Sequence, residues 1–181
     1  MNRRLFIGLR PPAAIRAKLL GEMHGVDHAR WQDDGQLHLT LRYVGEADHR
    51  LAEDLGLELG RIAMPRFTLR LEGTGVFEKK DLVHTLWAGL ADNPELDRLQ
   101  GKVERACQAA GFKQESRQFI PHVTLARMNA RSGSPIVFLQ RAAGLRLPDW
   151  DVEEFTLFES HLRPEGSLYE PIMRFGLEAA S

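Results

Sequence analysis

The chain has 181 residues, of which 43% are hydrophobic and 27% charged, a balance typical of a soluble globular protein with enough residues for a real core. Its formal net charge of −1 argues against a protein that coats long nucleic acids by charge alone, but it is compatible with binding one terminal phosphate. The single cysteine, Cys107, excludes an intramolecular disulfide.

The first apolar run, Leu5–Leu9, is too short for a membrane span and ends at Arg10, Pro11 and Pro12 without the small residues of a signal-peptide cleavage site. We therefore expect this run to be the first strand of a cytoplasmic protein that has no membrane segment. We take a monomer as the default.

Strands and helices are expected to alternate through the first half of the chain. A strand over residues 4–9 is followed by prolines that can begin a helix, and apolar residues then recur at helical spacing. Residues 24–36 are polar and predict a loop, which leads to a strand over 37–44. A turn at 45–48 precedes a helix with a leucine stripe, which ends at Pro65.

The rest of the chain, from residue 67 on, contains similar signals. The alternation from Phe67 to Leu71 predicts a strand that Gly73 and Gly75 interrupt, and residues 82–90 predict another strand. Asn93 can cap a helix that runs to Gly111. The short apolar run 136–139 is compatible with either a helix or a strand. Residues 152–159 and 167–177 predict two closing strands joined by a turn at 163–166.

A short motif occurs twice, nearly half the chain apart. It reads His-Leu-Thr-Leu from His38 and His-Val-Thr-Leu from His122. In a strand, successive side chains point to opposite faces, so each histidine shares a face with the threonine two residues on, Thr40 or Thr124, while the aliphatic residues face a core. We expect the two strands to face each other across one cleft with a phosphate between them.

The repeated motif predicts the fold class as well. Each half offers strands and a helix around its own motif, which suggests an internal duplication. We predict an α+β, bilobal duplicated fold, in which two antiparallel sheets flanked by helices surround a central cleft with pseudo-two-fold symmetry. Residues 1–181 are expected to form a single two-lobed domain.

Paired histidines suit the cleavage of a phosphodiester by in-line attack. One imidazole can take a proton from the attacking oxygen while the other gives a proton to the leaving oxygen, because the pKa of histidine lies near neutrality. The hydroxyls of Thr40 and Thr124 can donate hydrogen bonds to the non-bridging oxygens. Since protonated imidazole supplies positive charge, this chemistry needs no metal and no cofactor.

These motifs, together with the stretches around them, resemble the RNA 2′,3′-cyclic phosphodiesterase family, also called the 2′–5′ RNA ligase family, of the two-histidine phosphoesterase superfamily. The resemblance covers nearly the whole chain, and the paired motif is its specific part. The stretches that carry it are residues 4–9, LHLTLRYVGE at 37–46, 86–90, PHVTLAR at 121–127 and 155–160.

The resemblance implies that a terminal RNA 2′,3′-cyclic phosphate is opened to a 2′-phosphate. It also implies His38 as the acid, His122 as the base, and Arg127 as a residue near the substrate phosphate. On the residues alone the motifs are nearly symmetric, so the two proton roles stay open, and Arg127 could be a surface charge. Arg42 departs from the family pattern. By strand alternation it shares the face of His38 and Thr40, where it either adds positive potential to the rim of the cleft or is solvated.

Three hypotheses about function remain open on the sequence. The first is a metal-free hydrolase acting on RNA 3′ ends or small cyclic nucleotides. The second is a non-catalytic RNA- or nucleotide-binding module, and the third is 2′–5′ ligation as the physiological direction. His24 and His28 have a spacing seen in zinc sites but no third ligand nearby, so we expect no metal there. Aromatic residues that could stack on a nucleobase are Phe6, Trp31, Phe119 and Tyr169.

Overall fold

The computed structural model describes residues 1–179, and they form ten strands and four α-helices. The first elements are β1 (Arg3–Leu9), α1 (Ala13–Glu22), β2 (Arg30–Trp31), β3 (Leu39–Ala47), α2 (His49–Gly60), β4 (Phe67–Leu69) and β5 (Leu71–Lys79). They are followed by β6 (Leu82–Leu90), α3 (Pro94–Ala109), β7 (Val123–Arg127), α4 (Ile136–Ala142), β8 (Trp150–Val152), β9 (Glu154–Arg163) and β10 (Gly166–Gly176). None of these helices is both long enough and apolar enough to cross a membrane.

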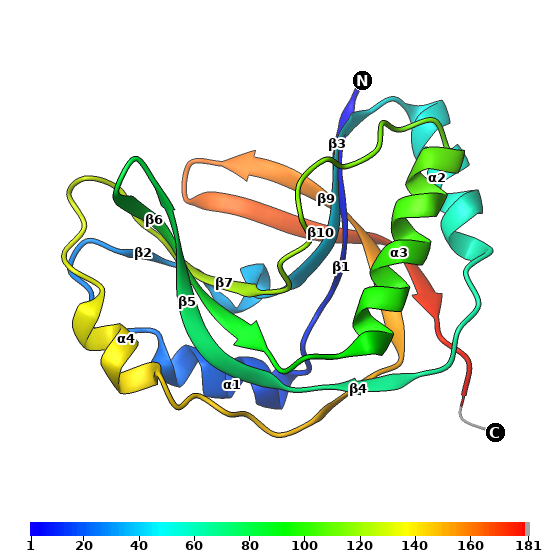
Figure 1. Ribbon diagram of the computed structural model, residues 1–181. Helices are drawn as coiled ribbons and strands as arrows, with labels where there is room; N and C mark the ends of the chain where they lie inside the picture. The colour runs from blue at the N-terminus through cyan, green and yellow to red at the C-terminus, as the bar shows by residue number, and fades with distance from the viewer. Residues whose placement is uncertain (180–181) are drawn as a thin grey trace.

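Eight strands form one large antiparallel sheet in the order β10-β9-β1-β3-β7-β6-β5, with β2 added beside β7, and β4 and β8 form a second sheet. Helices α2 and α3 lie together beside the part of the sheet that holds β1, β3, β9 and β10, whereas α1 and α4 lie near the part that holds β5, β6 and β7 (Figure 1). This arrangement confirms the predicted α+β class with antiparallel sheets and flanking helices.

The duplication is visible in the order of the elements. The chain repeats strand-helix-strand-helix-strand, first as β1-α1-β3-α2-β5 and then as β6-α3-β7-α4-β9. The last strand of each repeat crosses over to the other, because β5 pairs with β6 and β9 pairs with β1. Each part of the sheet therefore takes strands from both halves of the chain, whereas the sequence suggested that each half folds around its own motif.

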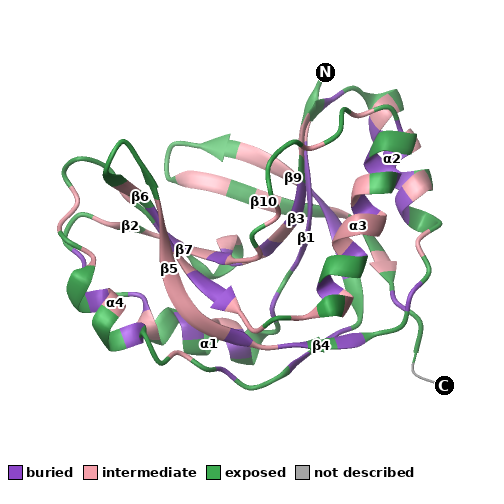
Figure 2. Cartoon of the chain, in the orientation of Figure 1, coloured by how far each residue is buried: buried purple, intermediate pink, exposed green. Residues whose placement is uncertain are grey.

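The two motif strands are neighbours in the same sheet. Strands β3 and β7 pair antiparallel, with Leu39 opposite Val123. This differs from the expectation that the strands face each other across a cleft. The core lies on the aliphatic faces of these strands, where Leu39, Leu41, Val123 and Leu125 are almost fully buried (Figure 2).

Several boundaries differ from the sequence expectation for local reasons. The polar segment 24–36 contains the short strand β2 and a 3₁₀ turn at Asp34–Gln36. Strand β3 continues to Ala47, and Asp48 then caps α2 by accepting a hydrogen bond from the Leu51 amide at 2.8 Å. Strand β5 runs through both Gly73 and Gly75, although its pairing with β6 is irregular at Gly73, between Leu71 and Thr74.

Candidate active site

The two motif histidines line one cavity of about 600 Å³, at the place where β3 meets β7. Thr40, Thr124 and Arg127 line the same cavity, so the structure brings together all five residues that the sequence singles out. His38 precedes the first residue of β3 and His122 precedes the first residue of β7, so the two copies place their imidazoles alike.

Each imidazole is held by the backbone carbonyl two residues before it. His38 Nδ1 lies 2.7 Å from the Gln36 carbonyl oxygen, and His122 Nδ1 lies 2.6 Å from the Ile120 carbonyl oxygen. A carbonyl can only accept, so in both rings Nδ1 carries a hydrogen and donates it. The neutral rings consequently keep the Nε2 lone pair, and that of His38 accepts from the Thr40 hydroxyl at 2.9 Å.

The two carbonyls are fixed in different ways. Gln36 belongs to a capping box, in which the Asp33 carboxylate accepts from the Gln36 amide and the Gln36 side chain accepts from the Asp33 amide. Ile120 belongs to the irregular segment 110–122, whose beginning is held by a carboxylate on α3, because the Glu115 amide donates to Glu104 Oε1 at 3.0 Å.

Aromatic side chains pack against both imidazoles. The ring of His38 lies 4.7 Å from Phe6 and 4.9 Å from Tyr169 between centroids, and that of His122 lies 4.8 Å from Phe77. This burial lowers the pKa of His38 to about 4, against the opposing effect of the Gln36 hydrogen bond, and burial also lowers the pKa of His122. Both rings are therefore neutral at pH 7.

A bulge occurs at the same place in both motifs. Thr40 pairs with Gly8 and Arg42 with Ile7, which leaves Leu41 without a partner on β1. In the same way Leu125 has no partner on β6, between Thr124 paired with Trp87 and Ala126 paired with Leu86. An extra residue reverses the alternation of faces beyond it. In each copy the bulged leucine, Leu41 or Leu125, faces the core. The residue after it also points away from the cavity, and the one after that points toward the cavity.

The second bulge explains the position of Arg127. Uninterrupted alternation would turn this residue toward the core, but after the bulge it returns to the face of Thr124. There its Nη1 donates to the Thr85 hydroxyl at 3.3 Å. Tyr43 holds the corresponding position after the first motif and also lines the cavity.

The first bulge corrects the expectation for Arg42. This residue does not share the face of His38 and Thr40, since the bulge turns it toward α3, where it is only 8% exposed. Its Nε donates to Glu104 Oε2 at 2.6 Å, and its other nitrogens donate to the carbonyls of Tyr43 and Lys113. Arg42 still borders the cavity, but it is not solvated, and Glu104 compensates its charge.

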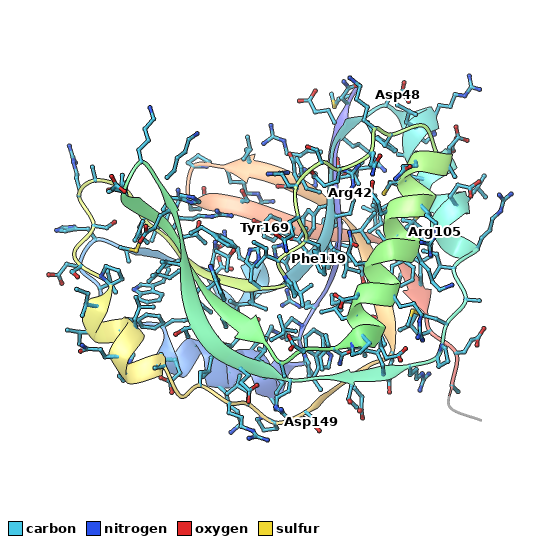
Figure 3. The ribbon with its side chains drawn as sticks, in the orientation of Figure 1. Arg42, Asp48, Arg105, Phe119, Asp149 and Tyr169 are labelled. Atoms are coloured by element: carbon cyan, nitrogen blue, oxygen red, sulfur yellow. The ribbon has the colours of Figure 1, made fainter. Side chains whose placement is uncertain are left out.

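The aromatic residues proposed for base stacking separate into three groups. Phe119 and Tyr169 line the cavity and approach it from the segment 110–122 and from β10 (Figure 3). Phe6 also lines the cavity, but it is 4% exposed and packs between His38 and Phe158. Trp31 packs against Phe138 of α4 instead.

Sequence reasoning missed several contributions to the site. Gln36 and Thr85 position His38 and Arg127, and Phe77 packs on His122. The capping box formed by Asp33 and Gln36 was readable in the sequence, since its residue types have the required spacing. The bulge at Leu41 leaves no signal in the sequence, because the polar residue Arg42 follows it, whereas the consecutive apolar residues Leu125 and Ala126 interrupt the alternation at the second bulge.

Comparisons with known proteins agree with this geometry. A family model described as the 2′-5′ RNA ligase superfamily matches residues 10–163. A relative from Aeropyrum pernix named RNA 2′,3′-cyclic phosphodiesterase is 34% identical over 152 residues, covering 82% of this chain and 85% of the relative. A relative of the same name from Escherichia coli K12 is 29% identical and covers 97% of each chain.

Solved structures are similar over almost the full length. The crystal structure of E. coli LigT complexed with 3′-AMP has a TM-score of 0.79 at 28% identity, with 98% of this chain and 99% of that chain covered. A crystal structure of a Thermus thermophilus protein has a TM-score of 0.80 at 28% identity, covering 98% of this chain and 100% of that one. On the family match, the duplicated fold and the paired motifs in one cavity, the chain belongs to the 2′–5′ RNA ligase superfamily.

Proposed function

We propose that this protein is an RNA 2′,3′-cyclic phosphodiesterase, which hydrolyses a terminal 2′,3′-cyclic phosphate to a 2′-phosphate by general acid–base catalysis without a metal ion. The observation that carries the proposal is the pair of imidazoles in one cavity, each with Nδ1 tied to a carbonyl. Such a ring can exchange a proton only through Nε2, the atom that the proposed reaction uses in both histidines.

In the proposed reaction, His122 Nε2 takes a proton from a water molecule whose oxygen attacks the phosphorus atom. The bond from phosphorus to the 3′ oxygen breaks, and this oxygen takes a proton from His38 Nε2. The product keeps its phosphate on the 2′ oxygen. Thr40, Thr124 and Arg127 would hold the non-bridging oxygens, because hydroxyl and guanidinium donors stabilise the charge that develops there.

The acid role requires a protonated His38, although burial lowers its pKa to about 4 in the protein alone. A bound phosphodiester brings one negative charge close to Nε2. At a separation of about 4 Å and an effective dielectric constant near 20, this charge stabilises the imidazolium by about 4 kcal/mol, enough to return the pKa of His38 to the neutral range. Substrate binding would therefore create the acid.

The experiment is to incubate the purified protein, in excess chelator, with an oligoribonucleotide that ends in a 2′,3′-cyclic phosphate, and to identify the position of the phosphate in the product. We expect a 2′-phosphate, and we expect His38→Ala and His122→Ala each to lower kcat by about 10² to 10⁴ while the fold is kept. Near wild-type activity of His122→Ala, or activity lost with the chelator, would contradict the proposal.

Two other functions share this cavity. A binding module would hold the cyclic phosphate end without turnover. Ligation to a 2′–5′ linkage would use the same residues, with a 5′-hydroxyl in place of water as the group that attacks the phosphorus atom and the 3′ oxygen again leaving. The relatives named RNA 2′,3′-cyclic phosphodiesterase favour hydrolysis. Measuring 2′–5′ product from a 2′,3′-cyclic phosphate end and a 5′-hydroxyl end, against hydrolysis in the same tube, separates these directions.

A further inference from the structure

Two arginines stand side by side at the edge of the cavity. Arg30 on β2 is the direct register partner of Arg127 on β7, and the next pair is Trp31 with Ala126. Directly opposite residues of an antiparallel pair point to the same face, with Cβ atoms about 4.5 to 5.5 Å apart. Arg127 lines the cavity, so Arg30 projects from the same face of the sheet. Trp31 and Ala126 face the other side, where Trp31 meets Phe138.

The guanidinium of Arg30 reaches across to the beginning of β10. A Cβ atom on Gly166 would lie 3.3 Å from Arg30 Nη2 and 3.1 Å from Gln36 Nε2, so a side chain at position 166 would crowd both groups. Gln36 lines the cavity and donates to the Ser167 carbonyl at 3.0 Å. Arg30 therefore lies beside the cavity wall, and the glycine leaves room for its head group.

The two guanidinium groups are not neutralised locally. In residues 1–179, neither Arg30 nor Arg127 forms an ion pair with a carboxylate, whereas Arg10 and Arg16 near the same end of the site both pair with Asp34. Like charges directly opposite each other on two strands are destabilising. A site that keeps two such charges together, exposed and on one face, is suited to an extended anion.

We propose that Arg30 binds the phosphodiester on the 5′ side of the terminal nucleotide, so that the protein selects the end of an RNA chain over a cyclic mononucleotide. The inference rests on the proposed function, in which Arg127 is near the terminal cyclic phosphate. The next phosphate of the chain is the one nearest to that group, and the next guanidinium on the same face is that of Arg30. A planar guanidinium donates two parallel hydrogen bonds to a phosphate, which fixes the direction of the strand.

The test compares two substrates and two variants. The substrates are 2′,3′-cyclic AMP and a short oligoadenylate that ends in a 2′,3′-cyclic phosphate. The variants are Arg30→Gln and a matched control, Arg105→Gln, which removes the same charge from an exposed position on α3 (Figure 3). Arg105, like Arg30, forms no ion pair among the described residues.

We expect Arg30→Gln to lower kcat/KM for the oligoadenylate about 10-fold or more, mainly through KM, because one charge-assisted contact is lost. Its kcat/KM for 2′,3′-cyclic AMP should stay within about 2-fold of wild type. The slope of log KM for the oligoadenylate against log salt should become shallower by about 0.7, the value for one phosphate contact to a single strand. Arg105→Gln should change none of these quantities.

Equal effects of Arg30→Gln on both substrates, no effect on either, or the same effects from Arg105→Gln would overturn the inference. If the wild-type protein hydrolyses neither substrate, the proposed function fails, and binding of the two corresponding 2′-phosphate products decides on Arg30. If Arg30→Gln then weakens binding of the oligonucleotide product but not of the mononucleotide product, the role of Arg30 is still supported. Thermal unfolding controls for folding, and the melting temperature of Arg30→Gln should equal or exceed that of wild type because like-charge repulsion is removed.

Discussion

Replacing Arg42 with methionine should destabilise the protein by about 3 kcal/mol. The side chains of Arg42 and Glu104 are only 8% and 15% exposed, and their ion pair is 2.6 Å long. Removal of one partner from a buried pair leaves the other charge uncompensated, at a cost of about 3 to 5 kcal/mol. We take the lower end because Glu104 keeps hydrogen bonds from the Glu115 amide and from Gln108. For a chain of this length, such a loss lowers the melting temperature by roughly 6 to 12 °C.

The control for this change is Arg105→Met on the outer face of α3 next to Glu104 (Figure 3). It makes the same chemical change at an exposed site and should shift the melting temperature by less than about 2 °C. The double variant Arg42→Met with Glu104→Leu should recover only part of the loss, since it removes the uncompensated charge but leaves the Glu115 amide without its acceptor. A melting temperature for Arg42→Met equal to that of Arg105→Met would refute the reasoning.

The same variant should respond to pH in a defined direction. Burial alone would raise the pKa of the Glu104 carboxyl, but hydrogen bonds from the Glu115 amide and Arg42 hold it below its ordinary value. A carboxyl with a lowered folded-state pKa adds stability above its unfolded pKa, and this stability is lost as the pH falls through the folded pKa. The gap in unfolding free energy between wild type and Arg42→Met should therefore narrow in acid. Urea denaturation at pH 7 and at pH 4 measures it.

Two further predictions concern the walls of the site. The folded-state pKa of His38, about 4, lies below the ordinary 6.5, so the unfolded chain binds more protons between these values and wild type loses stability as the pH falls through this window. His38→Gln should lose less unfolding free energy than wild type between pH 7 and pH 5. Equal losses for the two proteins, measured by urea denaturation at both pH values, would contradict this. A Cβ on Gly75 would overlap the ring of Trp87, so Gly75→Ala should cost about 1 to 3 kcal/mol, whereas Gly21→Ala, in open space on α1, should stabilise by about 0.5 to 1 kcal/mol. Equal melting temperatures for the two alanine variants would contradict the packing argument.

The sequence predicts those elements whose signals are local. Strand β6 has the expected bounds, Leu82–Leu90, and α3 begins after Asn93, whose side chain accepts from the amides of Glu95 and Leu96. Gly111 has the positive φ expected of a residue that ends a helix. The paired motif also places all five predicted site residues at one cavity.

Features that depend on distant partners could not be predicted in this way. The exchange of β5 and β9 between the repeats is a property of strand pairing, which leaves no mark on either strand alone. The orientation of Arg42 depends on the bulge at Leu41, and a bulge is defined by the partner strand as much as by its own residues. Strand β5 tolerates Gly75 because the ring of Trp87 on β6 covers it.

The repeated bulge allows the two halves of the cavity to be compared position by position. A cavity with perfect two-fold symmetry would accept a phosphodiester equally well in either of two opposite orientations. A single orientation of the bound phosphodiester can come only from positions where the two copies differ. Alignment of the copies on their bulges gives three such pairs of positions: Tyr43 corresponds to Arg127, Phe6 to Thr85, and Gly8 to Trp87. An engineer who wished to reverse the polarity of this site would begin by exchanging these pairs and leave both histidines in place.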